Sequence, residues 1–345
     1  MFNSESLGKK MKKTARLAVL MVLVLLSVAG TGLAEDLFSV TLLGTGSPRP
    51  SRHRFGNSTL VEVGGQRLLF DFGRGATIGL FDQGVPIGSI NAHFLTHMHS
   101  DHIDGLPDLY ATGWISTPYG KRTTPFVIYG PKGTKEMMHH IYNTFAEDRR
   151  IRSADEKGSY PLAGDDNDII KAYDIKPGVV FEKDGVKVTA FPVFHGELIE
   201  PCFGFKIEYK GHSVVLSGDT KYSKEVEKQA TGSDLLIHEV VVVGGDSANA
   251  AKIVAATPEY RNIINHHTTP EECGLLFKNA RPKLAVYSHI VIPNNPKAGV
   301  FPATPLDLIN QTRKMYDGPL VVGEDRMTFL VNANGVSMYM SEVNK

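Results

Sequence analysis

A short segment rich in metal-binding side chains constrains this chain more than any other feature of its sequence. Three histidines and one aspartate stand within six consecutive residues, His97-Met98-His99-Ser100-Asp101-His102. Residues 91–96 are predicted to form a strand that runs directly into this segment, and residues 104–115 are predicted to form a helix after it. His97 and His99 are two residues apart, so at a strand end their side chains point the same way. Imidazole and carboxylate are ligands of zinc and similar ions, so this turn predicts a metal site. A solvated histidine-rich turn is the alternative, and so many ligands in so few positions argue against it.

Three more metal-binding side chains follow predicted strands later in the chain. They are His195, Asp219 and His289, which come just after the predicted strands 186–193, 212–217 and 284–288. Loops at strand ends carry functional groups on a rigid frame, although a single loop histidine is usually only a surface residue. Together the three complete the ligand set that a site with two metal ions needs.

The order of the predicted elements indicates the architecture. Strands are predicted at 38–43, 59–63, 67–71, 91–96, 186–193, 203–208, 212–217, 235–239, 284–288, 327–331 and 336–339, and helices at 104–115, 133–143, 270–278 and 306–316. Strand groups followed by helices, twice over, predict an α/β protein with two packed sheets covered by helices, a four-layer αββα sandwich. The polar segment 149–177 is predicted to be a surface excursion beside the active site. No repeat or long linker interrupts the chain, which predicts one domain over residues 35–345.

The first 34 residues have the pattern of a secretory signal peptide. A basic stretch precedes an apolar run at 17–28, and small residues follow up to Ala34. The run is short for a membrane span of about 20 residues, which disfavours an uncleaved anchor. There is no cysteine near Ala34, so the sequence gives no support for a lipoprotein anchor. We therefore expect cleavage after Ala34 and a periplasmic or secreted protein, with no stable membrane association after cleavage.

Charge and cysteine content narrow the class of function. Removing residues 1–34 takes away five of the 37 basic and one of the 37 acidic residues, which leaves 32 against 36 and a net charge of −4. A mature chain with this net charge has no excess of basic residues with which to bind a nucleic-acid backbone. The two cysteines, Cys202 and Cys273, are predicted to be separate buried thiols, because nothing in the sequence places them within bonding reach.

Several short motifs accompany the predicted ligands. They are Leu43-Gly44-Thr45-Gly46-Ser47-Pro48, Leu69-Phe70-Asp71-Phe72-Gly73, Tyr129-Gly130-Pro131-Lys132-Gly133, His238-Glu239 and His267-Thr268-Thr269. With these motifs, and from about residue 38 to its end, the chain resembles the metallo-β-lactamase superfamily. The resemblance is to the branch that contains ribonuclease Z and the zinc-dependent arylsulfatases of that fold.

The resemblance assigns the ligands and implies two divalent metal ions as cofactor, with zinc expected. It places His97, His99 and His195 on the first ion, Asp101, His102 and His289 on the second, and Asp219 between the two. Asp101 also counts among the predicted catalytic residues, with His267 and Glu239. His267 matches a histidine that acts near the leaving group in ribonuclease Z, and Glu239 matches its acidic partner. The alternatives are a helix-start histidine before Pro270 and a buried carboxylate with a structural partner.

Other residues receive weaker interpretations. Asp71 is predicted to fix the loop behind the site rather than to touch metal. Candidates for the mouth of the pocket are Arg52, Arg54 and Trp114. No functional role is predicted for the remaining histidines, which are His53, His93, His139, His140, His212, His238 and His266.

The predicted chemistry is hydrolysis of a small sulfate or phosphate ester, arylsulfatase-like, by a hydroxide held between two metal ions. Metal binding lowers the pKa of water, and the ions stabilise charge on a sulfuryl or phosphoryl oxygen. The resemblance to ribonuclease Z implies a long arm that grips tRNA, inserted between two strands after the third metal histidine. Here only Tyr209-Lys210-Gly211 joins the two predicted strands, so tRNA is not expected as a partner.

Three alternatives stay open from the sequence. The first is a phosphodiesterase acting on small nucleotides or on nucleic acid outside the cytoplasm, or a ribonuclease Z-like endonuclease. The second is a lactonase or β-lactamase, which His267 and Glu239 disfavour. The third is a non-catalytic metal-binding module, which the complete ligand set disfavours. The expected partner is a small-molecule ester, and a homo-oligomer is compatible with the sequence.

Overall fold

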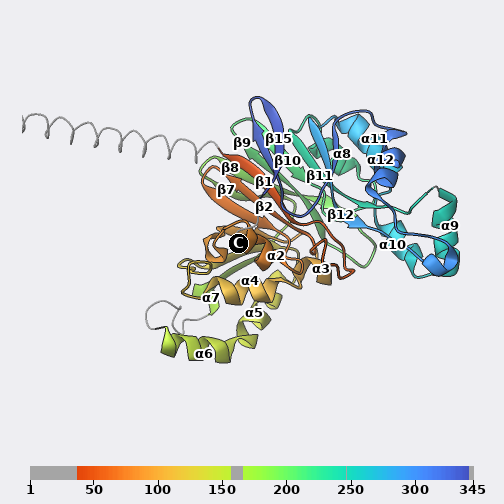
Figure 1. Ribbon diagram of the computed structural model, residues 1–345. Coiled ribbons are helices and arrows are strands. Elements are labelled where there is room, and N and C mark those ends of the chain that lie inside the picture. The colour runs from red at the N-terminus through yellow and green to blue at the C-terminus, as the bar shows by residue number, and fades with distance from the viewer. Residues whose placement is uncertain (1–36, 157–165, 246, 342–345) are drawn as a thin grey trace, which may run out of the picture.

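The predicted four-layer architecture is confirmed. The computed structural model describes residues 37–156, 166–245 and 247–341, and the predicted signal peptide lies outside these residues. Two sheets pack face to face, and helices cover their outer faces (Figure 1). Among the described residues, no helix has both the length and the apolar composition to cross a membrane.

The first sheet combines the two ends of the described chain. Its strands, in the order β15-β14-β1-β2-β3-β4-β5-β6, are β15 (Gly335–Met340), β14 (Met327–Asn332), β1 (Phe38–Gly44), β2 (Ser58–Val63), β3 (Gln66–Phe70), β4 (Ala92–Phe94), β5 (Phe126–Gly130) and β6 (Ile170–Asp174). Strand β1 pairs antiparallel with both β2 and β14, so the C-terminal hairpin extends a sheet begun at the N-terminal side. Strands β3 to β6 are parallel, so the ends of β3 and β4 open at one edge, where the metal-binding segment follows.

The second sheet carries the remaining predicted ligands. Its strands, in the order β13-β12-β11-β10-β9-β8-β7, are β13 (Leu320–Val322), β12 (Leu284–Val291), β11 (Leu235–Val241), β10 (His212–Leu216), β9 (Cys202–Tyr209), β8 (Val186–Val193) and β7 (Gly178–Lys183). Strands β10, β11 and β12 are parallel. The turn between β9 and β10 holds only Lys210 and Gly211, with φ of 46° and 83°. Two positive φ values are what a two-residue hairpin turn needs, so no arm is inserted there.

The helices form the two outer layers. Those on the first sheet include α2 (Ala76–Asp82), α4 (Leu106–Gly113) and α5 (Thr134–Thr144), and those on the second include α8 (Lys224–Gln229), α11 (Pro270–Ala280) and α12 (Pro305–Arg313). The other helical elements are α3 (Ser100–Ile103), α6 (Ala146–Asp155), α7 (Asp166–Ile169), α9 (Ser247–Ala256), α10 (Tyr260–His266), η1 (Ile87–Ser89) and η2 (Pro296–Ala298).

Side chains alternate between layers along each inner strand. In β3, Leu68 and Phe70 face the other sheet, while Leu69 packs under the helices. The space between the sheets is filled largely by aromatic and branched side chains, such as Phe94 and Phe205, whose ring centroids lie 5.7 Å apart. Successive side chains of a strand point to opposite faces of the sheet. Here one face packs against the other sheet and the opposite face packs against the helices.

The interpretation of segment 149–177 was wrong in part. It was predicted to be an irregular excursion, but it contains the end of α6, the short helix α7 and strand β6 at the edge of the first sheet. Edge strand β6 has only one buried residue, Ile170, so its sequence carries no clear apolar alternation. None of the described residues of this segment lines the active-site cleft.

Candidate metal centre

The predicted ligands converge from both sheets. The loop after β4 carries His97 and His99, and the single turn α3 carries Asp101 and His102. The second sheet supplies the other three, with His195 after β8, Asp219 after β10, and His289 within β12. All seven side chains are buried except His99, which is half-buried. The sandwich thus brings together side chains that lie up to 192 residues apart, from 97 to 289.

Three imidazoles form the first cluster. His99 Nδ1 lies 3.0 Å from His97 Nε2 and 3.2 Å from His195 Nε2. Ligand atoms around a tetrahedral zinc ion lie roughly 3.3–3.6 Å apart, as follows from metal–ligand distances of about 2.0–2.2 Å. The two measured distances fall slightly below this range, so the three nitrogens lie close enough together to be ligands of one ion.

The second cluster combines a carboxylate with two imidazoles. Asp101 Oδ2 lies 3.0 Å from His289 Nε2 and 3.7 Å from His102 Nε2. Asp101 and His102 are adjacent on α3, and His289 reaches them from the opposite sheet. These three side chains have the chemistry and spacing to hold a second ion.

One oxygen of Asp219 joins the two clusters. Its Oδ2 lies 3.4 Å from Nε2 of both His102 and His289 in the second cluster. The same atom lies 3.8 Å from His97 Nε2 and 3.7 Å from His195 Nε2 in the first. A single carboxylate oxygen within reach of both ligand sets is the arrangement of a bridging ligand.

The electrostatics of the site suit a bound cation. Burial lowers the pKa of His97 well below its usual value and that of His195 to about 4, so both imidazoles are neutral, as metal ligands must be. Burial also lowers the pKa of His102, but Asp219 and Asp71 outweigh it and raise that pKa well above the usual value. His102 Nε2 is buried without a hydrogen-bond partner among the described residues. The two carboxylates therefore favour a positive charge at this nitrogen, and a divalent metal ion bound to the neutral imidazole would supply that charge in place of the proton.

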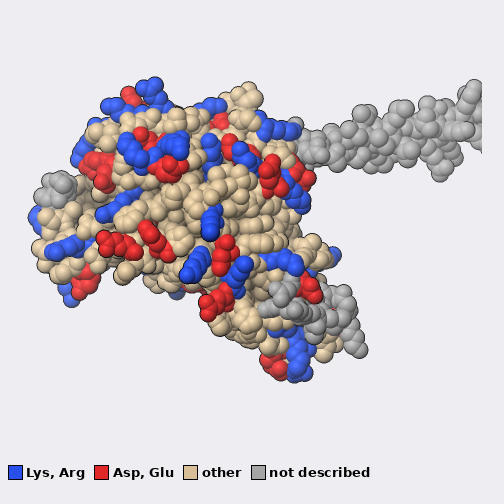
Figure 2. Space-filling view, turned by 180° about the vertical axis from the view of Figure 1, so that it is seen from behind, with Lys and Arg blue, Asp and Glu red and all other residues tan. Residues whose placement is uncertain are grey.

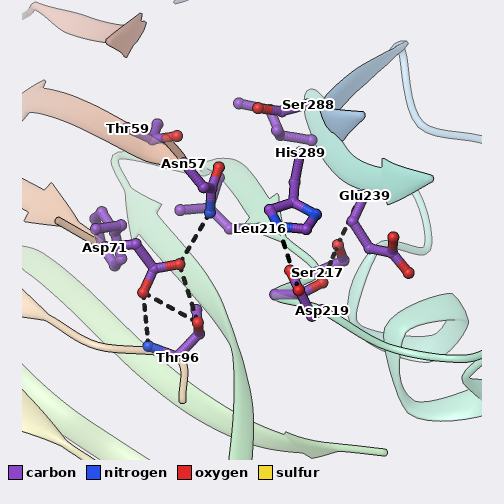
Figure 3. Close-up of a pocket in the computed structure, with 13 residues that line it drawn as sticks. Asn57, Thr59, Asp71, Thr96, Leu216, Ser217, Asp219, Glu239, Ser288 and His289 are labelled. Atoms are coloured by element: carbon purple, nitrogen blue, oxygen red, sulfur yellow. Dashed lines mark hydrogen bonds and ion pairs between the residues drawn. The ribbon is translucent and has the colours of Figure 1, made fainter. Parts of the chain in front are cut away.

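Asp71 lies behind the metal-binding segment and holds its side chains in position. One of its oxygens accepts from Asn57 Nδ2 at 3.0 Å, and the other accepts from the Thr96 N–H at 2.9 Å (Figure 3). The first oxygen also accepts from His102 Nδ1 at 2.8 Å. Thr96 Oγ1 also contacts His97 Nδ1 at 3.0 Å. Such carboxylate–histidine contacts fix the ring orientation of a ligand and raise its basicity. These contacts are those expected if Asp71 fixes the loop behind the site.

His289 lies inside a strand, not after it. Strand β12 continues to Val291, but its pairing with β11 shifts, so Ser288 and His289 stand opposite the single residue Glu239. His289 has a φ of 43°, the left-handed region that non-glycine residues rarely adopt. This bulge turns the imidazole into the site, and bulges recur beside active sites for this purpose.

His267 and Glu239 form a pair beside the clusters. His267 Nδ1 lies 2.9 Å from Glu239 Oε2, and Glu239 Oε1 accepts from the Thr268 N–H at 2.9 Å. Burial lowers the pKa of His267, but the charge and hydrogen bond of Glu239 outweigh it and raise that pKa to about 9. The next residue, Thr269, starts α11 with a capping box to Glu272, which anchors the backbone here. The free Nε2 of His267 is thus left for the site.

A cleft of about 920 Å³ opens over the two clusters. Its lining includes His99, Asp101, His195, Asp219, His267 and His289, with the loop Gly46–Ser51, Arg54, part of α10 and residues 290–294. Arg54 lines the cleft as predicted, whereas Arg52 does not, and Trp114 is buried in the core. His266, for which no role was predicted, lines the cleft, and its carbonyl oxygen contacts His195 Nδ1 at 3.0 Å.

A second, much smaller cavity lies behind the bridging carboxylate. It measures about 30 Å³ and is lined from both sheets, by residues that include Asn57, Asp71, Asp219 and Ser288 (Figure 3). Asp219 Oδ1 and Ser288 Oγ are buried there without a hydrogen-bond partner among the described residues. The oxygen of Asp219 that faces away from the clusters therefore borders open space rather than packed atoms.

The fold and the site define the class of protein. Two ligand clusters that share one carboxylate oxygen, set at the ends of strands in an αββα sandwich, are those of a metallo-β-lactamase-fold metallohydrolase. Residues 38–264 match the protein family described as Anti-Pycsar protein Apyc1. Ribonuclease Z of Mycolicibacterium paratuberculosis is 36% identical over 260 residues, which are 74% of this chain and 86% of that protein. The chain therefore belongs to the family of Apyc1 and is a homologue of ribonuclease Z.

Solved structures support the same fold. The metallo-β-lactamase fold protein YhfI from Bacillus subtilis is 18% identical, with a TM-score of 0.62 over 86% of this chain and 99% of that one. Human tRNase Z, short form, is 24% identical, with a TM-score of 0.56 over 84% of this chain and 98% of that one. At these identities the likeness concerns the arrangement of the two sheets.

Proposed function

We propose that this chain is a phosphodiesterase that acts on a small phosphodiester with two divalent metal ions, zinc being favoured by the imidazole-rich ligand set. The observation that carries the proposal is the position of Asp219 Oδ2, which lies 3.4–3.8 Å from nitrogens of both clusters beneath the cleft. In this proposal the seven ligands are those of the sequence-based assignment. When bound, two such ions activate water and neutralise charge on phosphoryl oxygens.

The chain's own residues supply orientation and a proton. Asp71 holds His102 in one orientation, and Glu239 does the same for His267. His267 Nε2 gives its proton to the oxygen of the leaving alcohol, because Glu239 favours the charged imidazole. Asp101 acts in catalysis through its place in the second cluster. The cleft lies within the range of about 300–1,000 Å³ that small ligands occupy, which supports a compact substrate.

The similarity to ribonuclease Z favours a phosphodiester over the aryl sulfate that was first expected. The name of that relative refers to cleavage of RNA, whose linkages are phosphodiesters, and the likeness covers 86% of it. A sulfate monoester carries one charge and no second ester arm, so it would leave much of the 920 Å³ cleft unfilled. The arylsulfatase-like activity therefore becomes the weaker candidate.

The test compares substrates on one preparation of zinc-loaded protein. We expect the kcat/KM for bis(p-nitrophenyl) phosphate to exceed those for p-nitrophenyl phosphate, p-nitrophenyl sulfate and a simple lactone. Asp219→Ala prepared in the same way controls for contaminating hydrolases. A higher kcat/KM for the sulfate ester in wild type would replace this proposal with the arylsulfatase.

A ribonuclease Z-like endonuclease is the second candidate, favoured by the 36% identity to ribonuclease Z. The two-residue turn between β9 and β10 leaves no arm at that point to grip a long RNA. On the face in Figure 2, acidic and basic side chains are interspersed and form no continuous basic stripe. We therefore expect no efficient cleavage of precursor tRNA at its 3′ end, and such cleavage would favour the endonuclease.

Export remains part of the proposal. We propose that residues 1–34 are a signal peptide, on the pattern of charge, apolar run and small residues. N-terminal sequencing of the protein recovered from a bacterial periplasm should begin at Glu35. Recovery of the full-length chain from the cytoplasm alone would contradict it.

A further inference from the structure

One wall of the cleft differs chemically from the rest. Helix α10 and residues 290–294 line it with apolar side chains, Ile263 and Ile292, and with amides, Asn262 and Asn294. No Asp, Glu, Lys or Arg from the described part of α10 or of 290–294 lines it. The facing loop carries Arg49 and Arg54 instead. The wall formed by α10 and 290–294 is therefore suited to an uncharged group that has both apolar faces and hydrogen-bonding edges.

The position of His267 indicates which of the substrate's two alcohol groups this wall contacts. Helix α10 ends at His266, directly before His267, and residues 290–294 directly follow His289. The rings of His267 and His289 stack at 5.6 Å. His267, whose Nδ1 is held by Glu239 Oε2 at 2.9 Å, thus stands where the wall begins. In the proposed function His267 faces the leaving alcohol, so the wall lies on the side of that alcohol.

The wall is held in place from its other side. Tyr260 packs with Ile264 on a small cluster built around Val243, Ile253 and Val300. The Tyr260 hydroxyl donates to the Asn294 carbonyl oxygen at 3.4 Å, which ties α10 to 290–294. Asn262 is exposed, and its amide makes no hydrogen bond with a described residue. Its donor and acceptor are therefore available to a ligand.

Building on the proposed phosphodiesterase function, we infer that α10 and residues 290–294 form the subsite for the leaving alcohol, with Asn262 and Ile263 as its specificity-determining residues. The ligand class is an uncharged, ring-bearing alcohol with hydrogen-bonding edges. In the step concerned, the water oxygen forms a bond to phosphorus, the water gives up one proton to solvent, and the bond from phosphorus to the leaving oxygen breaks. The leaving oxygen takes the proton of His267 Nε2, so the ring-bearing alcohol departs neutral. A proton from solvent restores His267 after the step.

A substrate with one ring-bearing arm and one small arm tests the inference by its products. Thymidine 5′-methyl phosphate has two ester bonds, and either thymidine or methanol can leave. We expect the wild-type protein to release thymidine and methanol in a ratio of at least about 10 to 1. A pocket that fits one group favours it over a smaller group by about that factor. Ile263→Ala should lower the product ratio about 10-fold. Asn262→Ala should lower it about fivefold, as loss of one hydrogen bond does.

The product ratio separates this inference from a general loss of activity. Incomplete metal loading or partial unfolding lowers both products equally and leaves their ratio unchanged. Asn265→Ala is the matched control, since Asn265 is an exposed asparagine of α10 that does not line the cleft, and its ratio should equal that of wild type. Preferential release of methanol by wild type, or ratios that Asn262→Ala and Ile263→Ala leave unchanged, would overturn the subsite while the phosphodiesterase stands. No hydrolysis of any phosphodiester would overturn both.

Discussion

The two halves of the chain contribute to the metal centre in different ways. The first half supplies four ligands within six residues, on one loop and one helical turn. The second half supplies three, spread from residue 195 to residue 289 on separate strands of one sheet. The first set is placed by local backbone geometry, whereas the second depends on the register of β8, β10 and β12.

The difference extends to the carboxylates behind the site. Asp71, from the first half, contacts the predicted ligand His102 at 2.8 Å. Glu239, from the second, contacts His267 at 2.9 Å. His267 was not predicted as a ligand, although its ring lies within 4.8 Å of ligand atoms of Asp219 and His289. The carboxylate of the first half therefore supports a predicted metal ligand, whereas that of the second half supports the proposed proton donor. We expect changes at Asp71 to act on metal affinity and changes at Glu239 to act on reactivity.

The largest expected effect comes from the atom that joins the halves. Asp219→Ala removes the oxygen shared by both clusters, and kcat/KM should fall by at least about 10³-fold, as for loss of a group that organises transition-state charge. Elemental analysis should find fewer than two ions per chain. His99→Ala, which lies in the first cluster only, should keep the second ion. Two bound ions and near-normal turnover in Asp219→Ala would show that the halves act independently.

The role of the second half is tested through His267. His267→Ala should lower kcat/KM for alkyl diesters about 10²–10⁴-fold, the usual effect of removing a general acid. Nitrophenyl diesters should lose little, because nitrophenolate leaves without a proton. Glu239→Gln should follow the same trend more weakly. Equal losses with good and poor leaving groups would show that His267 does not donate the proton.

A smaller effect distinguishes the two rear carboxylates. Asp71→Asn should weaken zinc affinity about 10–100-fold, as substitutions behind a metal ligand do. Glu239→Gln should leave zinc affinity unchanged, because Glu239 contacts His267 rather than a predicted ligand. Competition with a chromogenic chelator measures both variants side by side. Similar affinities in the two variants would remove the distinction between the halves.

The smallest effect concerns covalent cross-linking. Both cysteines belong to the second half, and Cys202 and Cys273 are free and buried, as predicted. A reducing agent should therefore leave the midpoint of thermal unfolding of the metal-loaded protein unchanged. A fall of several degrees on reduction would reveal a disulfide and a covalent contribution to the second half.

The sequence predicted those parts of the site that depend on local patterns. The segment from His97 to His102 could be recognised as a metal site because its predicted ligands are close together in the sequence. His195 and Asp219 could be recognised because clear strands precede them. The strand around His289 was predicted too short, since its bulge and left-handed φ leave no mark on apolar periodicity. Helix α10 was missed because none of its residues is fully buried and its apolar side chains, Tyr260, Ile263 and Ile264, are too few to give a clear periodicity.

The small cavity behind Asp219 has a mechanical consequence. Packed protein interiors are stiff, and a side chain that moves must usually displace its neighbours. The Asp219 carboxylate instead borders about 30 Å³ of open space on the side away from the clusters. We therefore expect this carboxylate to tilt at little cost in strain. Such a tilt would let the proposed bridge adjust to ions of different radius, such as zinc and manganese.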